Sequence, residues 1–489
     1  MRRLEYKWLV GITFVLGLIM QILDMTVLNV ALATLGREFH VGEATLQWVL
    51  TGYLISLAVF VPASGWIADR YGGKRTFQLA VVVFTAASVL CGLATEIWML
   101  IGARILQGVG GGMLVPVGQA MLFRAFPAHE RAKASAVLSV PITIAPMLGP
   151  LIGGALVEFA SWRWIFFINV PVGGLALLAA MLFLKEEQQS RPGRFDLPGF
   201  VLAGSGLATL LVGLDQGAQT GWGKPSVWGT LIVAAVLLSG LVARELRTPE
   251  PMLDLRLLGD RLFGTGNGLL LCSTGAIFGA LFLLPLYLQN LRGFGPLGSG
   301  LVLMPQALSM LATTQLVSRL YTRVGPRPLL LIGFTVLISV GLLLQLLDTA
   351  TPYWLLTVLL VWLGIGMGLL MTPLQTAAFA RISAASMGRA SSLFNASRQV
   401  ATALGTAVGA TILVALTECY TSTVDVSVPS AVVQAQMSAY RGAFLASIAF
   451  GALGLLLSLR VRNADAADTL RDRSAPSGDH SHPGTTTVR

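Results

Sequence analysis

GWIADRYGGKR, residues 65–75, decides the fold of this chain. It joins two apolar runs through a very short loop whose bases are Arg70, Lys74 and Arg75. Gly72 and Gly73 permit a tight reversal of the backbone, and Gly65 allows a neighbouring helix to approach closely. Asp69 can pair with an arginine or with a helix N-terminus. An ordinary cytoplasmic loop explains the bases but neither the acid nor the glycines, so we expect this segment to make specific contacts between helices.

Apolar runs dominate the rest of the chain. Of its 489 residues, 55% are hydrophobic and only 11% are charged, and the mean hydropathy is +0.75. Runs of roughly 18–25 apolar residues recur along nearly the whole chain, and each is long enough to cross a bilayer core as a helix. The first run, from Trp8 to Leu32, is too long for the apolar part of a cleaved signal peptide. We therefore expect an all-α integral membrane protein with about fourteen transmembrane helices.

The basic residues indicate the topology. Lysines and arginines gather in one set of alternate loops, and the opposite set holds little beyond Arg37, Arg163, Lys224 and Arg292. By the positive-inside rule, this bias and the even number of spans place both termini in the cytoplasm. The net charge of +10 is spread over short loops without interleaved aromatic residues, which argues against nucleic-acid binding.

Two pairs of similar segments indicate an internal repeat. GWIADRYGGKR resembles SRLYTRVGPRP (318–328), with Gly72 matching Gly325. GVGGGMLVP (108–116) likewise resembles GIGMGLLMTP (364–373). Membrane repeats of this kind usually flank a binding site near the middle of the bilayer.

The repeat and the composition predict four regions. From Val461 onward almost nothing is apolar, which is typical of disorder. We expect an N-terminal six-helix bundle (1–184), a linker with two extra transmembrane helices (185–260), a C-terminal six-helix bundle (261–460) and a disordered cytoplasmic tail (461–489).

QILDMTVLNVAL, residues 21–32, places an acid inside the first apolar run. A charge there costs roughly 2.5–3.5 kcal/mol on insertion scales, so it needs a partner or a role. At about 1.5 Å per residue, Asp24 lies roughly 24 Å from the cytoplasmic edge of a core about 30 Å thick, and Arg104 lies roughly 9 Å from the outer edge. The two residues are therefore at similar depth and can neutralise each other.

Two interpretations of this pair stay open. In the first, Asp24 takes up a proton from outside, loosens its tie to Arg104 and competes with substrate. In the second, the pair is a fixed salt bridge, or Asp24 caps a break in the helix. The chain has no GxxxxGK[ST], HExxH or GxSxG motif, so transport work would draw on an ion gradient rather than on ATP.

The 65–75 segment resembles the signature loop of the major facilitator superfamily. Further segments narrow the resemblance to the fourteen-span drug:proton antiporter branch, which is EmrB/QacA-like. These segments are LDMTVLNVAL (23–32), RILQGVGGG (104–112), LGPLIGG (148–154), WRWIFFINVPVG (162–173), FDLPGFVLAG (195–204) and GRASSLFNASRQVATALG (388–405). The resemblance implies a major facilitator fold that works by alternating access, with the 65–75 loop as a cytoplasmic latch between the halves.

The resemblance also implies an exporter motif in the fifth span, carried by Gly149, Pro150, Gly153 and Gly154. Proline bends a helix and glycines allow close packing, which agrees with a gating role, although the segment could serve packing alone. The chain departs from the pattern at Ala136 and Ala145, which stand in place of glycines, and at Thr322, where the second-half latch would carry an acid. We therefore expect asymmetric gating.

Candidate substrate contacts are polar or polarizable residues in spans that should line a cavity, although each is more often a packing residue. They are Gln21, Asn29, Tyr53, Met113, Phe282, Tyr287, Gln289, Gln375, Phe394 and Asn395. Arg398 lies about 12 Å into the thirteenth span and either faces the cavity or snorkels towards the cytoplasm. Aromatic and methionine-rich linings suit varied apolar ligands. Acids of the second half lie near span ends, so strong selection for dications is not expected.

The residues and the resemblance together predict a proton-coupled antiporter that exports hydrophobic or amphipathic compounds, as in multidrug efflux and antibiotic resistance. Its expected partners are small substrates, protons and the lipid bilayer, and its expected place is the cytoplasmic membrane of a bacterium, as a monomer. We expect no enzymatic activity, no cofactor and no metal site. Two alternatives stay open, a dedicated exporter of one lipid, antibiotic or metabolite, and a membrane sensor or scaffold that does not transport.

Overall fold

The computed structural model describes residues 5–186, 193–348, 351–424 and 428–470, which form helices joined by short loops. Within these residues, 14 helical segments are long and apolar enough to cross a membrane. This confirms the all-α membrane fold and the expected number of spans.

The first bundle holds six spans. They are α1 (Tyr6–Phe39), α2 (Glu43–Tyr71), α3 (Gly73–Gly92), α4 (Ile97–Ala125), α5 (Arg131–Phe159), and the pair α6 (Trp164–Phe167) and α7 (Asn169–Phe183), which together form the sixth. Glycines of α4 let its neighbours approach: Gly108 and Gly112 face backbone oxygens of α2, and Gly110 faces one of α3. A Cβ at any of the three would meet these oxygens at 2.6–2.7 Å, so a larger residue would force the helices apart.

The second bundle repeats this arrangement. Its spans are α10 (Arg261–Asn290), α11 (Pro296–Val324), α12 (Pro326–Leu344), α13 (Tyr353–Ala378), α14 (Met387–Thr421) and α15 (Pro429–Ser458). Gly364 and Gly368 of α13 face backbone oxygens of α11, and Gly366 faces side chains of α12. The glycines of 364–373 therefore let neighbouring helices approach α13 closely, as those of 108–116 do at α4. The sequence repeat predicts this likeness.

Two extra helices lie between the bundles in the sequence, α8 (Leu197–Thr220) and α9 (Pro225–Arg247), and the chain continues through η2 (Leu255–Gly259) to α10. α8 packs against both α2 and α14 and so follows the seam between the bundles. Polar contacts tie this pair to each side: Gln47 Nε2 donates to Asp215 Oδ2 at 3.2 Å, and Trp222 Nε1 donates to Thr411 Oγ1 at 2.5 Å.

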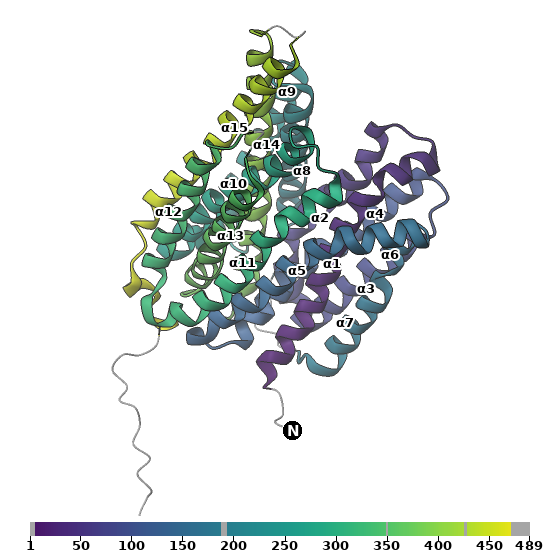
Figure 1. The fold of residues 1–489 in the computed structure, drawn as a ribbon. Coiled ribbons are helices and arrows are strands. Elements are labelled where there is room, and N and C mark those ends of the chain that lie inside the picture. The colour runs from purple at the N-terminus through teal and green to yellow at the C-terminus, as the bar shows by residue number, and fades with distance from the viewer. Residues whose placement is uncertain (1–4, 187–192, 349–350, 425–427, 471–489) are drawn as a thin grey trace, which may run out of the picture.

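The two ends of the molecule differ. We call the end that carries the turn around Gly72 together with residues 5 and 470 the latch face, and the opposite end the open face. At the latch face the bundles meet, chiefly through α2 against α14 and α5 against α11. Towards the open face the helices of the two bundles diverge (Figure 1).

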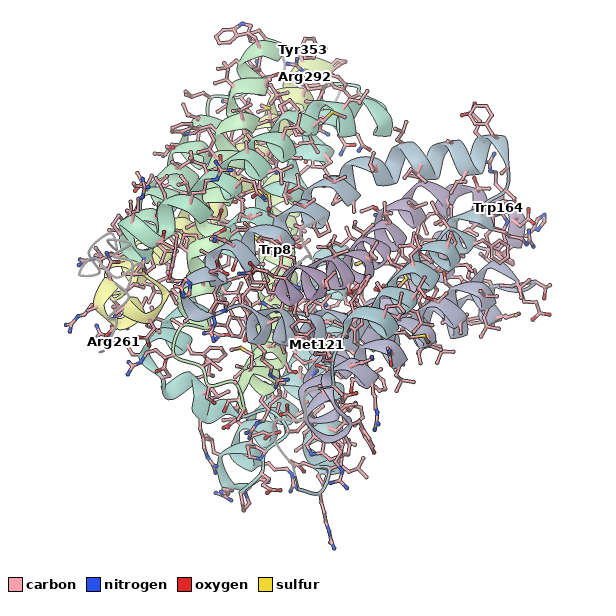
Figure 2. All side chains as sticks on the ribbon, turned by 90° about the horizontal axis from the view of Figure 1, so that it is seen from below. Trp8, Met121, Trp164, Arg261, Arg292 and Tyr353 are labelled. Atoms are coloured by element: carbon pink, nitrogen blue, oxygen red, sulfur yellow. The ribbon has the colours of Figure 1, made fainter. Side chains whose placement is uncertain are left out.

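The prediction of a disordered tail is wrong for residues 461–470. There η3 (Asn463–Thr469) lies on the latch face, against η1 (Ala128–Glu130) and the ends of α12 and α13. Arg261 lies beside this segment (Figure 2), with its Nε 3.8 Å from Asp465 Oδ2. Composition did not reveal the segment because hydrogen bonds rather than apolar burial hold most of it. Residues 471–489 of the expected tail lie outside the described residues.

Candidate functional site

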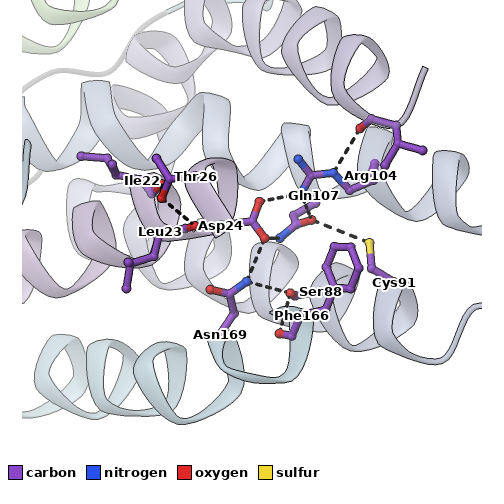
Figure 3. A network of polar contacts seen from close by, with 11 residues as sticks. Ile22, Leu23, Asp24, Thr26, Ser88, Cys91, Arg104, Gln107, Phe166 and Asn169 are labelled. Carbon is purple, nitrogen blue, oxygen red and sulfur yellow. Dashed lines mark hydrogen bonds and ion pairs between the residues drawn. The ribbon is translucent and has the colours of Figure 1, made fainter. Parts of the chain in front are cut away.

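An acid and an arginine meet inside the first bundle, as their predicted depths require (Figure 3). Arg104 Nη1 donates to Asp24 Oδ2 at 2.5 Å, and both side chains are fully buried. The other carboxylate oxygen, Oδ1, accepts from Gln107 Nε2 at 2.8 Å and from Asn169 Nδ2 at 2.9 Å. One carboxylate thus joins α1, α4 and α7.

A second layer of hydrogen bonds orients the amide of Asn169. Ser88 Oγ on α3 donates to the carbonyl oxygen of Phe166 at 2.9 Å, so its lone pairs are free to accept from Asn169 Nδ2, also at 2.9 Å. Asn169 is the first residue of α7, directly after the break that separates α7 from α6. Asn169 therefore hydrogen-bonds Asp24 from the residue that follows the break in the sixth span, and Ser88 holds the Asn169 amide in that orientation.

The arginine side of the network is oriented in the same way. Gln107 Oε1 accepts from Arg104 Nη1 at 2.8 Å, which turns the amide nitrogen of Gln107 towards Asp24. Arg104 Nε donates to the carbonyl oxygen of Val49 at 3.2 Å, and its guanidinium lies over the Tyr53 ring, 4.3 Å from the centroid. A buried pair with this many partners is costly to break, about 3–5 kcal/mol when one member is removed.

Sequence reasoning did not assign Gln107 and Asn169 to this site. Both lay within motifs that carry the family resemblance, and Gln107 is one helical turn from Arg104, which places the two on one face. That spacing was a usable signal for Gln107. No local signal could identify Asn169 or Ser88, because α7 and α3 are brought to Asp24 only by the packing of the bundle.

Asp69, a predicted latch residue, has its side chain buried at the latch face. Its Oδ1 accepts from Arg124 Nη2 at 3.2 Å, and its Oδ2 lies 4.0 Å from Arg389 Nε at the start of α14. Arg124 Nε also donates to the carbonyl oxygen of Ala384, in the loop before α14, at 3.0 Å. The acid of the first bundle is thus paired with a base of the second.

Close backbone approach completes this contact between α2 and α14. A Cβ on Gly65 would meet the carbonyl oxygen of Gly388 at 2.8 Å, so no larger residue fits without a shift. One residue earlier, the hydroxyls of Ser64 and Ser392 share a hydrogen bond of 2.8 Å. Gly65 and Asp69 therefore both lie at the contact between α2 and α14.

A further set of contacts joins the bundles through the other helices of the latch face. Arg131 Nη1 of α5 donates to the carbonyl oxygen of Phe379 at 2.6 Å, and Gln315 Nε2 of α11 donates to that of Ala136 at 3.1 Å. Asn395 Nδ2 of α14 donates to Gln119 Oε1 of α4 at 2.6 Å. Polar contacts of the two bundles with each other, within the described ranges, all come from this end of the molecule.

Other predicted gating residues have local partners. Gly72 joins α2 to α3 and Gly73 is the first residue of α3. Lys74 Nζ donates to the carbonyl oxygen of Met181, and Arg75 lies 3.6 Å from Glu186. Both bases therefore fasten the latch loop to the end of α7, within the first bundle. Arg70 is exposed beside Asp69.

The fifth-span motif serves the packing of α5 on α1. Cβ atoms added to Gly149 and Gly153 would meet Thr26 and Val27, so both glycines allow the close approach that was expected. The expectation is wrong for Gly154, where an added Cβ would meet open space. The side chain of Pro150 lies outside what the structure describes.

The predicted substrate contacts separate into distinct groups. Tyr53 stacks on Arg104, and the Tyr287 hydroxyl donates to the carbonyl oxygen of Asp348 at 2.8 Å, so both are packing residues in this conformation. Phe394 and Asn395 are buried in the latch-face interface, where Phe394 packs against Phe379 with ring centroids 5.2 Å apart.

The remaining candidates differ in exposure. Asn29 and Gln289 are exposed, Phe282 is half-buried, and the buried members are Gln21, Met113 and Gln375. Arg398 is half-buried on α14. Sequence position did not separate residues of the interface from residues of the diverging half.

The chain resembles known proteins in sequence and in fold. A family model described as Major Facilitator Superfamily matches residues 14–406. The chain is 33% identical, over 82% of its length and 75% of the relative's, to the uncharacterized MFS-type transporter YhcA of Bacillus subtilis (strain 168). It is 34% identical, with the same coverage, to a multidrug resistance protein B homolog of Mycobacterium tuberculosis (strain ATCC 25618 / H37Rv). It is 32% identical, over 81% of its length and 85% of the relative's, to the putative multidrug resistance protein MdtD of Pectobacterium carotovorum subsp. carotovorum (strain PC1).

Two solved structures share the fold at 16% sequence identity. The human organic anion transporter MFSD10 (TETRAN) superposes with a TM-score of 0.64, covering 93% of this chain and 99% of that one. The proton:xylose symporter XylE superposes with a TM-score of 0.60, covering 93% and 94%. At this identity the likeness concerns the arrangement of helices alone.

Proposed function

Because this chain belongs to the major facilitator superfamily, we propose that it is a proton-coupled antiporter that exports hydrophobic or amphipathic compounds by alternating access. Multidrug resistance is the activity in the names of relatives 32–34% identical to it, which favours export of more than one compound. The latch face would lie in the cytoplasm of a bacterium, with both termini, because loop lysines and arginines concentrate there.

The observation that carries this proposal is the sealed network around Asp24. As a carboxylate, Asp24 accepts three hydrogen bonds and balances the charge of Arg104. When a proton binds one carboxylate oxygen, the group gains an O–H donor and loses its charge, so it can no longer hold three donors in place. At least one of the ties to α4 or α7 must then open, and proton uptake is converted into movement of helices.

The network has atoms beside it that could receive the released partners. Arg104 Nη2, Gln21 Oε1 and the hydroxyl of Tyr53 are buried and have no hydrogen-bond partner within the described part of the chain. Gln21 lies one helical turn before Asp24 on α1, and Tyr53 lies under the guanidinium. The same side chains can therefore form a second set of hydrogen bonds once Asp24 is neutral. A fixed salt bridge would not need these unpaired atoms.

The conformation supports the direction of coupling. With the latch face closed and the bundles diverging at the other end, the protein is in the state that would release substrate outside and take up a proton there. One proton moving inward at 100 mV supplies about 2.3 kcal/mol, enough for a roughly 50-fold gradient of a neutral solute.

The test is efflux from proteoliposomes under an imposed pH gradient, with Asp24→Asn compared with wild type. The amide keeps the size of the side chain but cannot carry the proton, so we expect pH-driven efflux to fall at least roughly tenfold. Exchange of labelled for unlabelled substrate without a gradient should persist, because it needs no net proton movement.

Glu96→Gln is the matched control, since Glu96 is an exposed acid at the open face. It should transport like wild type. Undiminished pH-driven efflux by Asp24→Asn would refute the coupling role of Asp24, and efflux that ignores a protonophore in wild type would refute proton coupling altogether. Efflux of several chemically unrelated dyes would exclude a dedicated exporter, and absence of any transport would favour a sensor or scaffold.

A further inference from the structure

Arg398 is a cation well inside α14 for which the described residues supply no partner. It lies 11 residues after the start of α14 at Met387, about 16 Å along the helix. Its guanidinium makes no hydrogen bond or ion pair with any residue that the structure describes. An ionisable group at this depth is costly and marks a functional site unless a partner is present.

The place of Arg398 is where the contact between the bundles ends. Residues 390–396 of α14 are all buried, whereas residues 397–400 are all half-exposed. Arg398 is therefore the first charged side chain of α14 beyond the closed part of the interface, and it is too far from the helix end to reach the latch face. This argues against the snorkelling alternative.

The helical face of Arg398 points between the bundles. Ser391 and Asn395 contact α4 of the first bundle, where Asn395 Nδ2 and Ser391 Oγ bind Gln119 and Ser391 Oγ also binds the carbonyl oxygen of Pro116. Arg398 follows these two residues at a spacing of seven and three, so it continues the same stripe. The same stripe continues seven residues further on at Gly405, which packs on Gly275 of α10. Arg398 therefore lies on α14 between residues that contact α4 of the first bundle and a residue that contacts α10 of the second.

Charge in this region is unbalanced. Asp24 is the acid that lies away from the helix ends in the described spans, and Arg104 already neutralises it within a sealed network. The acids Asp215 and Glu418 lie within the last turns of α8 and α14. Arg398 therefore lies where the bundles begin to diverge, and the described chain supplies no matching carboxylate.

We propose that Arg398 binds the anionic head group of the exported compound, so that the substrates are amphiphiles with one carboxylate, sulfonate or phosphate on an apolar body. The planar guanidinium presents paired donors that match such a group, and its low exposure strengthens the charge-assisted hydrogen bonds. This inference rests on the proposed export function and specifies its substrate class. It also predicts discrimination against cations, which the unbalanced charge repels.

The test uses three probes with one body and different heads: pyrenebutyrate, pyrenebutanol and pyrenebutylamine. Binding is measured by fluorescence on purified protein in nanodiscs of neutral lipid, with the signal of empty nanodiscs subtracted. Wild type should bind pyrenebutyrate about tenfold more tightly than pyrenebutanol, as one charge-assisted hydrogen-bonded pair implies, and pyrenebutylamine most weakly.

The variants isolate the guanidinium. Arg398→Gln should reduce the ratio of butyrate to butanol affinity to near one, and Arg398→Lys should restore part of the ratio because it keeps the charge. Arg319→Gln removes the same charge from an exposed position at the latch end of α11 and should leave the ratio unchanged.

Three results would overturn the proposal: equal affinity of wild type for all three heads, preference for pyrenebutylamine, or an equal loss of all three in Arg398→Gln. If Arg398→Gln does not fold, the relative affinities of wild type and of Arg398→Lys for the three probes still test the proposal. The proposed export function is tested separately, by pH-driven efflux of uncharged pyrenebutanol from wild-type proteoliposomes. Because pyrenebutanol has no head-group charge, loss of this efflux would contradict export and not the role of Arg398.

Discussion

The turn at Gly72 and the turn at Gly325 share a backbone conformation and differ in what holds them. Each glycine ends one long helix and begins the next, with φ of +93° at Gly72 and +87° at Gly325. Three residues before each glycine stand Asp69 in the first bundle and Thr322 in the second. The two turns of the repeat therefore share a backbone shape, but the second has Thr322 where the first has an acid.

The anchors of the two turns are of different chemistry. Asp69 binds Arg124 within the first bundle and lies 4.0 Å from Arg389 of the second, so charged contacts of a buried acid hold the first turn on both sides of the bundle interface. At the second turn, Asn463 Oδ1 accepts from the backbone N–H of Arg327 at 3.0 Å, and its Nδ2 donates to the carbonyl oxygen of Val324 at 3.1 Å. The second turn is thus held by neutral hydrogen bonds from the chain's own C-terminal segment.

The difference predicts which of the two turns is coupled to closure of the latch face. A buried ion pair is strongly favourable only while both members are in contact, so the Asp69 contact distinguishes the closed latch face from the open one. Asn463 binds backbone atoms of the second bundle, so this contact does not itself join the two bundles. We therefore expect the first turn to control gating and the second to maintain local structure.

The largest effect should follow from breaking the charged anchor. Asp69→Asn leaves Arg124, which is almost wholly buried, without its counter-charge, and should weaken the closed latch face by about 3 kcal/mol. The measurement is the maleimide labelling rate of Ser392→Cys, in a background without the three native cysteines, because Ser392 is buried in the closed interface. Labelling should rise at least roughly tenfold.

Thr322→Val is the matched control for that experiment. Thr322 occupies the same position of the repeat and hydrogen-bonds only its own helix, to the carbonyl oxygen of Arg319 at 3.4 Å. Its substitution should leave the labelling rate of Ser392→Cys unchanged. Equal rates in Asp69→Asn and wild type would contradict the assignment of the latch to Asp69.

An intermediate effect should follow from straining the shared backbone. Gly72→Ala and Gly325→Ala each force a side chain into a region open almost only to glycine, at a cost of about 1–3 kcal/mol. The added Cβ would also press on Glu186 at the first turn and on Asn463 at the second. Both variants should lower the thermal unfolding temperature by similar amounts.

Gly102→Ala provides the comparison for the glycine variants. Gly102 lies inside α4, and an added Cβ there meets nothing within 4 Å. Alanine should be neutral or slightly stabilising at this helical position. Unfolding temperatures of Gly72→Ala or Gly325→Ala as high as that of Gly102→Ala would show that the turns are not constrained as described.

The smallest effect should follow from removing the neutral anchor. Asn463→Ala loses two partly exposed hydrogen bonds, worth about 1 kcal/mol each. Amide hydrogen exchange should accelerate in residues 321–329, while the labelling of Ser392→Cys should stay at the wild-type rate. Faster labelling in Asn463→Ala would mean that the second turn also contributes to the latch.

Much of the site was accessible to sequence reasoning because the bilayer imposes a common depth scale. A rise of about 1.5 Å per residue was sufficient to bring Asp24 and Arg104 to one level, and the structure joins them. It could not assign Asn169, because which helix faces Asp24 from the side depends on the packing of α7. For the same reason Phe394 and Asn395 were expected in a cavity and lie in the closed interface instead.

The sequence by itself determined the fourteen spans, the glycine faces of α4 and α13, the two tight turns and the buried acid with its arginine. Each of these depends on hydrophobicity, helical period or backbone freedom, which act over a few residues. Only the tertiary structure decided that Asp69 meets bases 55 and 320 residues further along the chain, that Asn463 holds the turn that lacks this acid, and that Arg398 has no partner among the described residues. Those facts depend on which helix faces come together, and the free energy of that choice is spread over the whole packed interface rather than carried by any local pattern.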